Sequence, residues 1–321
     1  MELDRPFLKL PIIFVADALA MEVRALPTSA WVPHPTGFVG NEAVRLVSPQ
    51  GQETENFLGE MGPTEHLLRS PHMMRVMEEL GGVWGRSRLM GLGPHGEVPR
   101  HVDSHYYWRT HSRIHVPVIT NPAVTFTCGE QTVHMAAGEC WLFDSFRWHQ
   151  VLNGGDAQRV HMVLDTVGGD SFWDLVDDAR AGVTEPRVVS EGDGNADRLA
   201  FEKVNTPKIM SPWEIRTHLA FLAGHAKPHP RLDAVLHRLN RFADQWAVVW
   251  TRYGEDDGAW ATYFAVLETL KRDLGQLGGG DILLDNGLKL FLALDHILLL
   301  NVLRPRDQTA AAPAIERRVA P

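Results

Sequence analysis

The chain has 321 residues, of which 44% are hydrophobic and 22% are charged, so it can bury a sizeable core and is not disordered as a whole. Acidic residues outnumber basic residues by 40 to 31, and the net charge of −9 argues against a nucleic-acid-binding protein, which normally carries a basic excess. Two cysteines are too few for a disulfide framework. The most apolar stretch, 288–303, is interrupted by Lys289, Asp295 and His296, so we expect no transmembrane span and a cytoplasmic location.

The first 82 residues predict N-terminal flanking strands and a helix. A strand is expected at 11–15. A helix is expected over 71–80, because Ser70 can cap its first turn, proline suits its first position and Gly81 can end it.

Between residues 83 and 180 the sequence changes to short runs rich in Val, Ile, Thr, Phe and Trp, separated by turn residues such as Asn121-Pro122. The predicted strands are 86–92, 113–120, 123–128, 131–135, 139–143, 149–152 and 159–166. About seven short strands at such close spacing are typical of an antiparallel sandwich or barrel.

Residues 181–321 predict a helical C-terminal region. Ser211 and Glu214 form a capping box at the start of a helix that we expect to reach about residue 223. Further helices are expected at 231–253, 258–274 and 286–303. Their apolar residues recur at helical spacing, so we expect these helices to pack into a core or to form a homodimer surface.

Histidines gather in the predicted β segment, where eight of the chain's 16 lie between His95 and His161. Residues two apart in a strand point to the same face, so His101 and Asp103 present an imidazole and a carboxylate side by side. His149, on a later antiparallel strand, can complete one triangular face of a metal ion. Two histidines and one carboxylate, with three positions left open, form the site of non-haem iron(II) oxygenases, whereas a structural zinc site would be closed by a fourth ligand.

Arg159, ten residues after His149, suits a second task at such a site. The iron needs an electron-donating cosubstrate, which in the largest group of these enzymes is 2-oxoglutarate, and the far carboxylate of that molecule must be held by a cation. Arginine grips a carboxylate through two parallel hydrogen bonds and keeps its charge. The alternative interpretation of Arg159 is a salt bridge to Asp144 or Asp165.

Other residues of this segment allow more than one interpretation. The aromatic run 106–108 follows the His-x-Asp motif and either walls a substrate pocket or forms a hydrophobic strand edge. His134 and His161 either orient the ligands or are core histidines. We expect Asp144 and Asp165 to serve turns and strand ends.

The segment from about Arg86 to Asp165 resembles the aspartyl/asparaginyl β-hydroxylase group of 2-oxoglutarate-dependent oxygenases. The helical C-terminal third resembles, in architecture alone, the bacterial L-proline 3-hydroxylases of the same group. The matching stretches are Arg113-Ile-His115-Val-Pro-Val-Ile, Ala137-Gly-Glu-Cys-Trp-Leu-Phe-Asp144, His149-Gln-Val-Leu-Asn153 and Arg159-Val-His161-Met-Val-Leu-Asp165.

The resemblance implies a double-stranded β-helix of the cupin or jelly-roll type. The residues that it implies are, for iron, His101, Asp103 and His149 and, for 2-oxoglutarate, Arg159, Arg113 and His115. The animal enzymes of this group have glycine where Asp103 stands, whereas the proline hydroxylases keep the carboxylate. This chain shares the second pattern, so the resemblance implies a complete set of three ligands.

We therefore expect a mainly β core with flanking helices and an α-helical C-terminal region, acting as an Fe(II)/2-oxoglutarate-dependent dioxygenase that also uses O2. The resemblance implies hydroxylation of an amino acid, or of an amino-acid residue in a peptide, at the β-carbon, with release of succinate and CO2. No nucleic-acid or membrane partner is expected. Two alternatives stay open, a non-catalytic cupin-type module that binds a metal or small molecule and a different metal enzyme on the same barrel. Arg159 counts against the second.

Overall fold

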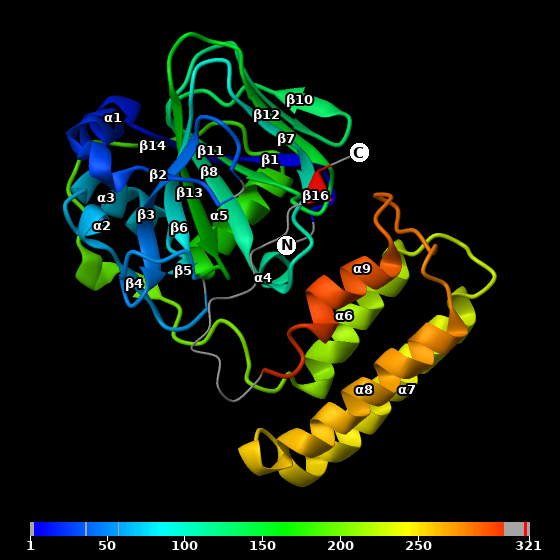
Figure 1. Cartoon of the computed structure of the whole chain (residues 1–321). Coiled ribbons are helices and arrows are strands. Elements are labelled where there is room, and N and C mark those ends of the chain that lie inside the picture. The colour runs from blue at the N-terminus through cyan, green and yellow to red at the C-terminus, as the bar shows by residue number, and fades with distance from the viewer. Residues whose placement is uncertain (1–2, 36, 57, 305–317, 320–321) are drawn as a thin grey trace. The chain divides into compact units, whose positions relative to one another are not determined.

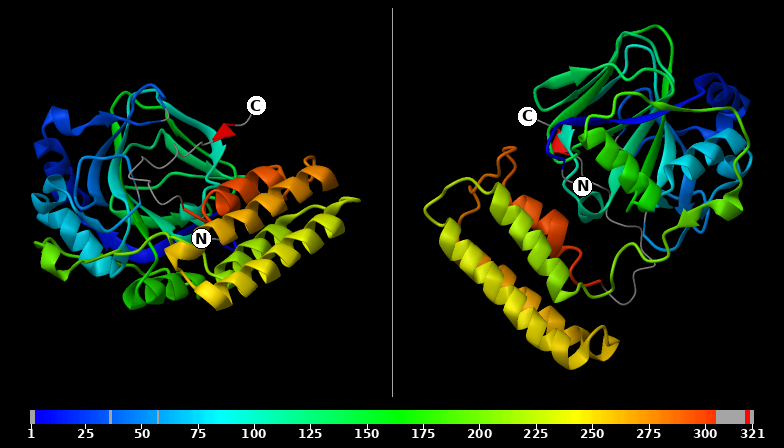
Figure 2. Two further views of the ribbon diagram at one scale, coloured as in Figure 1. Left: turned by 60° about the horizontal axis from the view of Figure 1, so that its bottom comes forward. Right: turned by 180° about the vertical axis from the view of Figure 1, so that it is seen from behind.

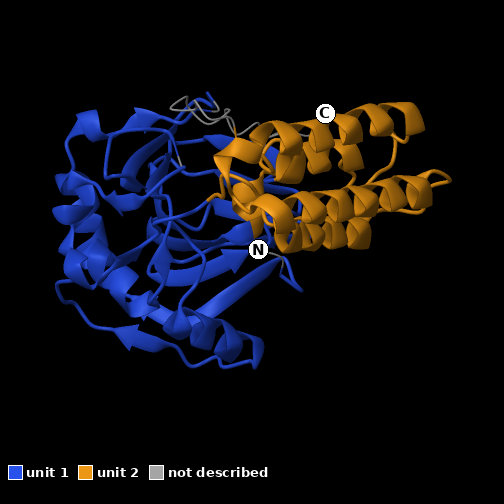
Figure 3. Ribbon diagram, turned by 90° about the horizontal axis from the view of Figure 1, so that it is seen from below, with its two compact units in different colours: residues 1–103, 110–205, 311–321 blue, residues 104–109, 206–310 orange. Residues whose placement is uncertain are grey.

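The computed structural model describes residues 3–35, 37–56, 58–304 and 318–319 (Figures 1 and 2). The chain divides into two compact units (Figure 3). Unit 1 comprises residues 1–103, 110–205 and 311–321, and unit 2 comprises residues 104–109 and 206–310. Unit 1 contains the β-sheets and unit 2 is helical.

A large sheet in unit 1 takes strands from distant parts of the sequence (Figure 1). Its main order is β14-β1-β11-β8-β13-β6-β3-β2, and β4, β5 and β15 pair at its margins. These strands are β1 (Phe7–Phe14), β2 (Val32–Pro33), β3 (Asn41–Pro49), β4 (Met61–Pro63), β5 (Val83–Trp84), β6 (Ser87–Leu92), β8 (Ser112–Ile119), β11 (Glu139–Phe143), β13 (Arg159–Thr166), β14 (Arg187–Val189) and β15 (Ala200–Phe201). The boundaries predicted at residues 82 and 180 therefore both fall within unit 1, whose sheet includes strands from either side of each.

A second sheet has the order β10-β9-β12-β7-β16. Its strands are β7 (Glu97–Val102), β9 (Val124–Cys128), β10 (Gln131–Val133), β12 (His149–Asn153) and β16 (Arg318–Val319). One buried cluster joins the sheets, with Phe7 and Phe143 from the large sheet packing against Phe126 and Val151 from the second. The central strands of both sheets pair antiparallel, and two such sheets packed around one core form the double-stranded β-helix that the resemblance implied, so the predicted fold is confirmed.

The strands predicted between residues 86 and 166 are all present, with ends displaced by two residues at most. One core strand, β7, was not predicted, because Pro99 interrupts it and its other residues include the polar Glu97 and Arg100. The strand expected at 11–15 lies earlier and is longer, and as β1 it pairs with β11. Both additions complete sheets through pairings between residues that lie far apart in the sequence.

Helices cover the face of the large sheet that points away from the second sheet (Figure 2). The helix α1 (Ala16–Ala25) contacts β8, and α5 (Asp170–Arg180) contacts β1. Between them lies α3 (Pro71–Leu80), which contacts both and has the bounds predicted from its proline and glycine, and α2 (Glu65–Leu68) contacts β3. Ser70 was expected to cap α3, and this was wrong, because its hydroxyl donates to the His66 carbonyl at 2.8 Å and makes no cap hydrogen bond. Short 3-10 turns occur at Thr28–Ala30 and Ala196–Arg198.

Unit 2 is built around three long helices, α6 (Pro212–His225), α7 (Leu232–Tyr253) and α8 (Trp260–Leu277), with α7 in contact with both others. The predicted cap of α6 is confirmed, since the Glu214 amide donates to Ser211 Oγ at 3.2 Å. The helix expected at 286–303 is shorter, comprising α9 (Leu290–Leu294) and a π-helical turn (Asp295–Leu299), because Asn286 and Gly287 form a turn before it. The homodimer surface predicted for these helices stays a prediction.

The remaining helical elements are α4 (Tyr106–Thr110), which lies mostly in unit 2, and a 3-10 turn at Asp257–Ala259. None of the described helices combines the length and the hydropathy that a membrane-spanning segment needs.

Candidate metal centre

The structure brings together the three residues predicted as metal ligands. Strands β7 and β12 pair antiparallel, and this pairing places His149, the first residue of β12, opposite His101 near the end of β7. Asp103 follows β7 directly, two residues after His101. Ligand atoms of the three side chains all lie within 4.8 Å of one another, and all three residues are buried.

Hydrogen bonds to the backbone orient both imidazole rings. His101 Nδ1 lies 2.7 Å from the carbonyl oxygen of Pro99, and His149 Nδ1 lies 2.9 Å from that of Arg147. A carbonyl oxygen only accepts, so Nδ1 must carry the proton in each ring and Nε2 is the nitrogen with the lone pair. Metal-binding histidines are commonly oriented in this way. Two imidazole nitrogens and one carboxylate oxygen form a donor set that suits iron(II).

Arg113 lies between two buried carboxylates. Its Nε and Nη2 donate side by side to the two oxygens of Asp165, at 2.9 and 3.2 Å, and its Nη1 donates to Asp103 Oδ2 at 3.2 Å. Arg113 and Asp165 are direct cross-strand partners on β8 and β13. Asp165 lies at the end of β13, as expected, and its carboxylate also holds an arginine that touches a candidate ligand. The cosubstrate role predicted for Arg113 stays a prediction.

Arg159 is a buried cation of a different kind. Arg159 is the first residue of β13, and its Nη1 donates to the carbonyl of Met90 at 3.5 Å. Among the described residues, its buried Nε and Nη2 have no hydrogen-bond partner and no carboxylate pairs with it. The alternative of a salt bridge to Asp165 or Asp144 is therefore wrong, since those residues pair with Arg113 and Arg147. Burial lowers the pKa of Arg159 to about 9, so it remains charged at neutral pH.

Two neutral histidines lie close to this guanidinium. His115 Nδ1 and His161 Nδ1 are 3.4 Å apart, and the His115 ring packs edge-on against Phe126 and Phe143. Burial, and then the charge of Arg159, lower the pKa of both rings well below the ordinary histidine value. Arg113, His149 and Asp103 also act electrostatically on His115, so the ring lies near both the arginine and the metal-ligand cluster. Within the described residues, Nε2 of both histidines is buried without a hydrogen-bond partner.

The other predicted residues have separate surroundings. The hydroxyl of Tyr106 donates to Glu214 within unit 2 at 2.6 Å, and a substrate-wall role for 106–108 stays a prediction. His134 Nδ1 donates to the Val124 carbonyl at 2.9 Å, which indicates a structural contribution.

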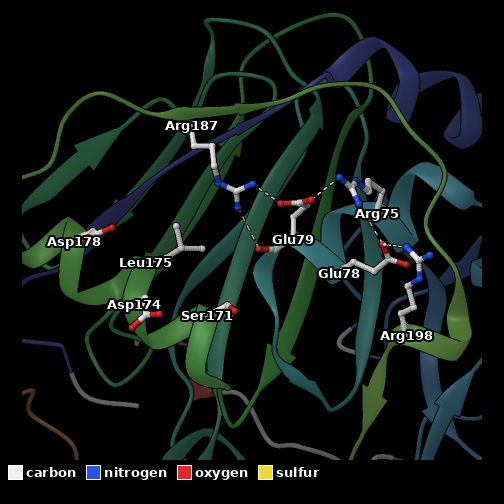
Figure 4. A pocket seen from close by; sticks show the side chains of 9 residues that line it. All are labelled: Arg75, Glu78, Glu79, Ser171, Asp174, Leu175, Asp178, Arg187 and Arg198. Atoms are coloured by element: carbon white, nitrogen blue, oxygen red, sulfur yellow. Dashed lines mark hydrogen bonds and ion pairs between the residues drawn. The ribbon is translucent and has the colours of Figure 1, made fainter.

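A pocket of about 520 Å³ lies on the helical side of unit 1 (Figure 4). Each of its arginines is paired with a glutamate of α3. Arg75 contacts Glu79 at 2.6 Å, Arg187 also pairs with Glu79, and Arg198 lies 3.9 Å from Glu78. These pairs connect α3 to β14 and to the turn at 196–198, and they leave none of the arginines uncompensated, so we assign this pocket a structural role.

The fold and the donor set define a class of protein, a double-stranded β-helix with two histidines and one carboxylate at its centre. Residues 46–168 match the family model described as aspartyl/asparaginyl beta-hydroxylase, which confirms the resemblance seen in the motifs. The matched region contains all three candidate ligands together with Arg113 and Arg159. None of the curated proteins compared with this chain matches it.

Several solved structures are similar to parts of this chain at low identity. An oxidoreductase of the 2OG-Fe(II) oxygenase family from Burkholderia pseudomallei is 12% identical, with 51% of this chain and 88% of that chain covered and a TM-score of 0.39. A prolyl-4-hydroxylase from Pseudomonas putida is 15% identical, with 51% and 93% covered and a TM-score of 0.34. A protein with a double-stranded beta-helix domain from Klebsiella pneumoniae is 13% identical, with 27% and 78% covered and a TM-score of 0.22. These similarities concern the fold alone.

Proposed function

We propose that this protein is an Fe(II)/2-oxoglutarate-dependent hydroxylase of an amino acid, or of an amino-acid residue in a peptide. The observation that carries the proposal is Arg159, a buried guanidinium without a carboxylate partner among the described residues, in the same interior as the His101, Asp103 and His149 cluster. Burying an uncompensated charge is costly, so such a residue is typical of a site built for an anionic ligand. Arg159 and two of the candidate ligands act electrostatically on His115, and a dicarboxylate bound to the metal would supply the carboxylate that Arg159 lacks.

His101, Asp103 and His149 would hold the iron, each through one atom. Iron(II), 2-oxoglutarate and O2 together would supply the oxidant for an unactivated C–H bond, with succinate and CO2 as the other products. The protein contributes geometry and exclusion of water. Backbone carbonyls orient the two imidazole rings, and the aromatic rings of Phe126 and Phe143 keep the interior apolar beside His149.

Arg159 would bind the far carboxylate of 2-oxoglutarate. Its Nε and Nη2 form one edge of the guanidinium, the edge that makes two parallel hydrogen bonds to a carboxylate. The charge of Arg159 acts on the buried His115 ring, which, being neutral, can donate one further hydrogen bond without adding charge. Arg159 and His115 were both expected at the cosubstrate, and the unsatisfied donors of Arg159 support that assignment.

The substrate class is supported by the match of residues 46–168 to the aspartyl/asparaginyl beta-hydroxylase family. Hydroxylation at the β-carbon is the finer part of the proposal and follows from the same description. Free proline and a peptidyl aspartate or asparagine are the first substrates to examine.

The test is binding, followed by turnover. Under anaerobic conditions, 2-oxoglutarate added to the Fe(II)-loaded protein should produce a visible charge-transfer band in the wild type, and not in Arg159→Met. Arg69→Met is the matched control, because Arg69 is exposed and its guanidinium pairs, within the described part of the chain, with Glu65 alone. A succinate-release screen over amino acids and short peptides then identifies the substrate. An iron-loaded wild type that binds no 2-oxoglutarate overturns the proposal and favours the non-catalytic cupin-type module.

A further inference from the structure

We propose that Arg113, anchored by Asp165, is a positioning residue that makes Asp103 present a single carboxylate oxygen to the metal. The inference rests on the metal site of the proposed function and adds two residues to it. Neither Arg113 nor Asp165 acts here as a metal ligand. Their part is to set how many coordination positions the protein occupies.

The geometry of Arg113 is fixed from one side. Its Nε and Nη2 make the two-pronged contact with Asp165, and strand pairing places these residues directly opposite one another on β8 and β13. Both side chains are buried, with 9% of Arg113 and 1% of Asp165 exposed. A guanidinium held by two parallel hydrogen bonds on a paired strand has little freedom to turn. Only Nη1 then extends to Asp103.

The contact with Asp103 distinguishes its two oxygens. Oδ2 accepts from Arg113 Nη1 at 3.2 Å, whereas Oδ1 lies 3.9 Å from His101 Nε2. Oδ1 is therefore the oxygen on the side of the imidazole ligands, and Oδ2 is held by Arg113. A carboxylate that used both oxygens would occupy an additional position on the metal. The proposed reaction needs three positions for cosubstrate and oxygen, so a single-oxygen contact keeps the site open.

Asp165 also governs the charge at the ligand. Arg113 is shared between two carboxylates, so the group of three carries a net negative charge and Asp103 keeps its attraction for a cation. If Asp165 were neutral, more of the charge of Arg113 would act on Asp103, and the guanidinium would lose the two-pronged contact that keeps it on Oδ2. The two residues therefore have opposite effects on metal affinity, and an ordinary structural ion pair would not behave in this way.

The experiment measures Co(II) affinity and the visible Co(II) spectrum of the full chain under anaerobic conditions. Asp165→Asn should weaken Co(II) binding by about tenfold to 100-fold, the usual effect of losing a partner that supports a ligand. Arg113→Gln should bind Co(II) at least as tightly as the wild type, with a spectrum of altered coordination number and 2-oxoglutarate binding at least about tenfold weaker. The double variant should recover the Co(II) affinity that Asp165→Asn loses. Circular dichroism checks that each variant is folded.

The matched control is Arg238→Gln, which removes an arginine from a pair with Asp273 in unit 2, with Nε 2.8 Å from the carboxylate. This variant should leave Co(II) and 2-oxoglutarate binding unchanged. Equal Co(II) affinity in all variants, or weakening of the same size in Arg113→Gln and Asp165→Asn, overturns the inference. If Arg113→Gln or Asp165→Asn does not fold, the double variant tests the inference. Co(II) binding that is weaker in the double variant than in the wild type contradicts the proposed role. A wild type that binds Co(II) but not 2-oxoglutarate overturns the proposed function alone, and the metal comparison still decides the inference.

Discussion

Replacement of Arg159 by methionine should stabilise the protein and remove 2-oxoglutarate binding at the same time. Among the described residues this guanidinium has no carboxylate partner, and its pKa falls from the ordinary arginine value to about 9 because of burial. A fall of that size corresponds to about 5 kcal/mol of destabilisation of the charged form. Methionine has a similar volume and no charge. Since relaxation recovers part of the cost in real proteins, we expect a net gain of about 1–4 kcal/mol in the free energy of unfolding.

The same substitution removes a two-pronged, charge-assisted contact with the cosubstrate. Hydrogen bonds to charged groups contribute about 1.5–3 kcal/mol each, so two of them correspond to at least a 100-fold loss of 2-oxoglutarate affinity. Arg159→Lys keeps the charge but lacks the planar guanidinium, so its affinity for 2-oxoglutarate should lie between those of the wild type and Arg159→Met.

Urea unfolding with and without 2-oxoglutarate, in the presence of Mn(II), measures both effects. At 100 times its dissociation constant, the cosubstrate should raise the free energy of unfolding of the wild type by about 2.7 kcal/mol and should leave Arg159→Met unchanged. Arg69→Met should behave like the wild type in both conditions. A less stable Arg159→Met variant that 2-oxoglutarate still stabilises would refute the reasoning, because the guanidinium would then be satisfied within the protein and the ligand would bind elsewhere.

Three further outcomes are expected. His149→Ala should lose Fe(II) in a metal-content assay, and a stoichiometric metal content in that variant would contradict the ligand assignment. Burial lowers the pKa values of the His115 and His161 rings. The unfolded chain therefore binds more protons than the folded protein as the pH falls below about 6.5, the ordinary histidine pKa. Because of this difference, the free energy of unfolding should fall by up to about 2.7 kcal/mol per pH unit for the two rings together. If the free energy of unfolding depends on pH in the same way in the double variant His115→Gln/His161→Gln, other groups are responsible. Asn153→Ala should lower the free energy of unfolding by about 2 kcal/mol, because the Asn153 amide donates to the carbonyls of Leu92, Gly93 and Ala157. An unaltered denaturation midpoint would contradict that role.

The polar interior of unit 1 divides into two ends along one pair of strands. Asp103, Arg113 and Asp165 form an ion-paired group at one end. Arg159 and the two neutral histidines form the other end, where donors remain unsatisfied among the described residues. Both arginines were expected at the cosubstrate. Arg113 pairs with two carboxylates of the protein, whereas no carboxylate of the described residues pairs with Arg159. This contrast supports the proposal that Arg159 binds the cosubstrate, and a cosubstrate role for Arg113 stays a prediction.

Local sequence determined much of this protein. Alternating apolar residues and turn signals placed seven strands between residues 86 and 166 to within two residues, and the positions of Pro71 and Gly81 set the ends of α3. The two-residue spacing of His101 and Asp103 placed both side chains on one side of the chain at the end of β7, since this follows from strand geometry alone. These features depend on neighbours within a few residues, and a sequence pattern records such neighbours directly.

Tertiary structure decided which residues distant in sequence meet. The strand β7 is stabilised by its pairing with β12 in spite of Pro99, and β1 joins a sheet whose next strand, β11, lies more than a hundred residues further on. The partner of Arg113 is a carboxylate 52 residues away, chosen by the register between β8 and β13. Register depends on the packing of whole faces, and a shift of one residue would turn Asp165 away from Arg113. For that reason the candidate ligands could be predicted from the sequence, whereas the ionic group that holds one of them could not.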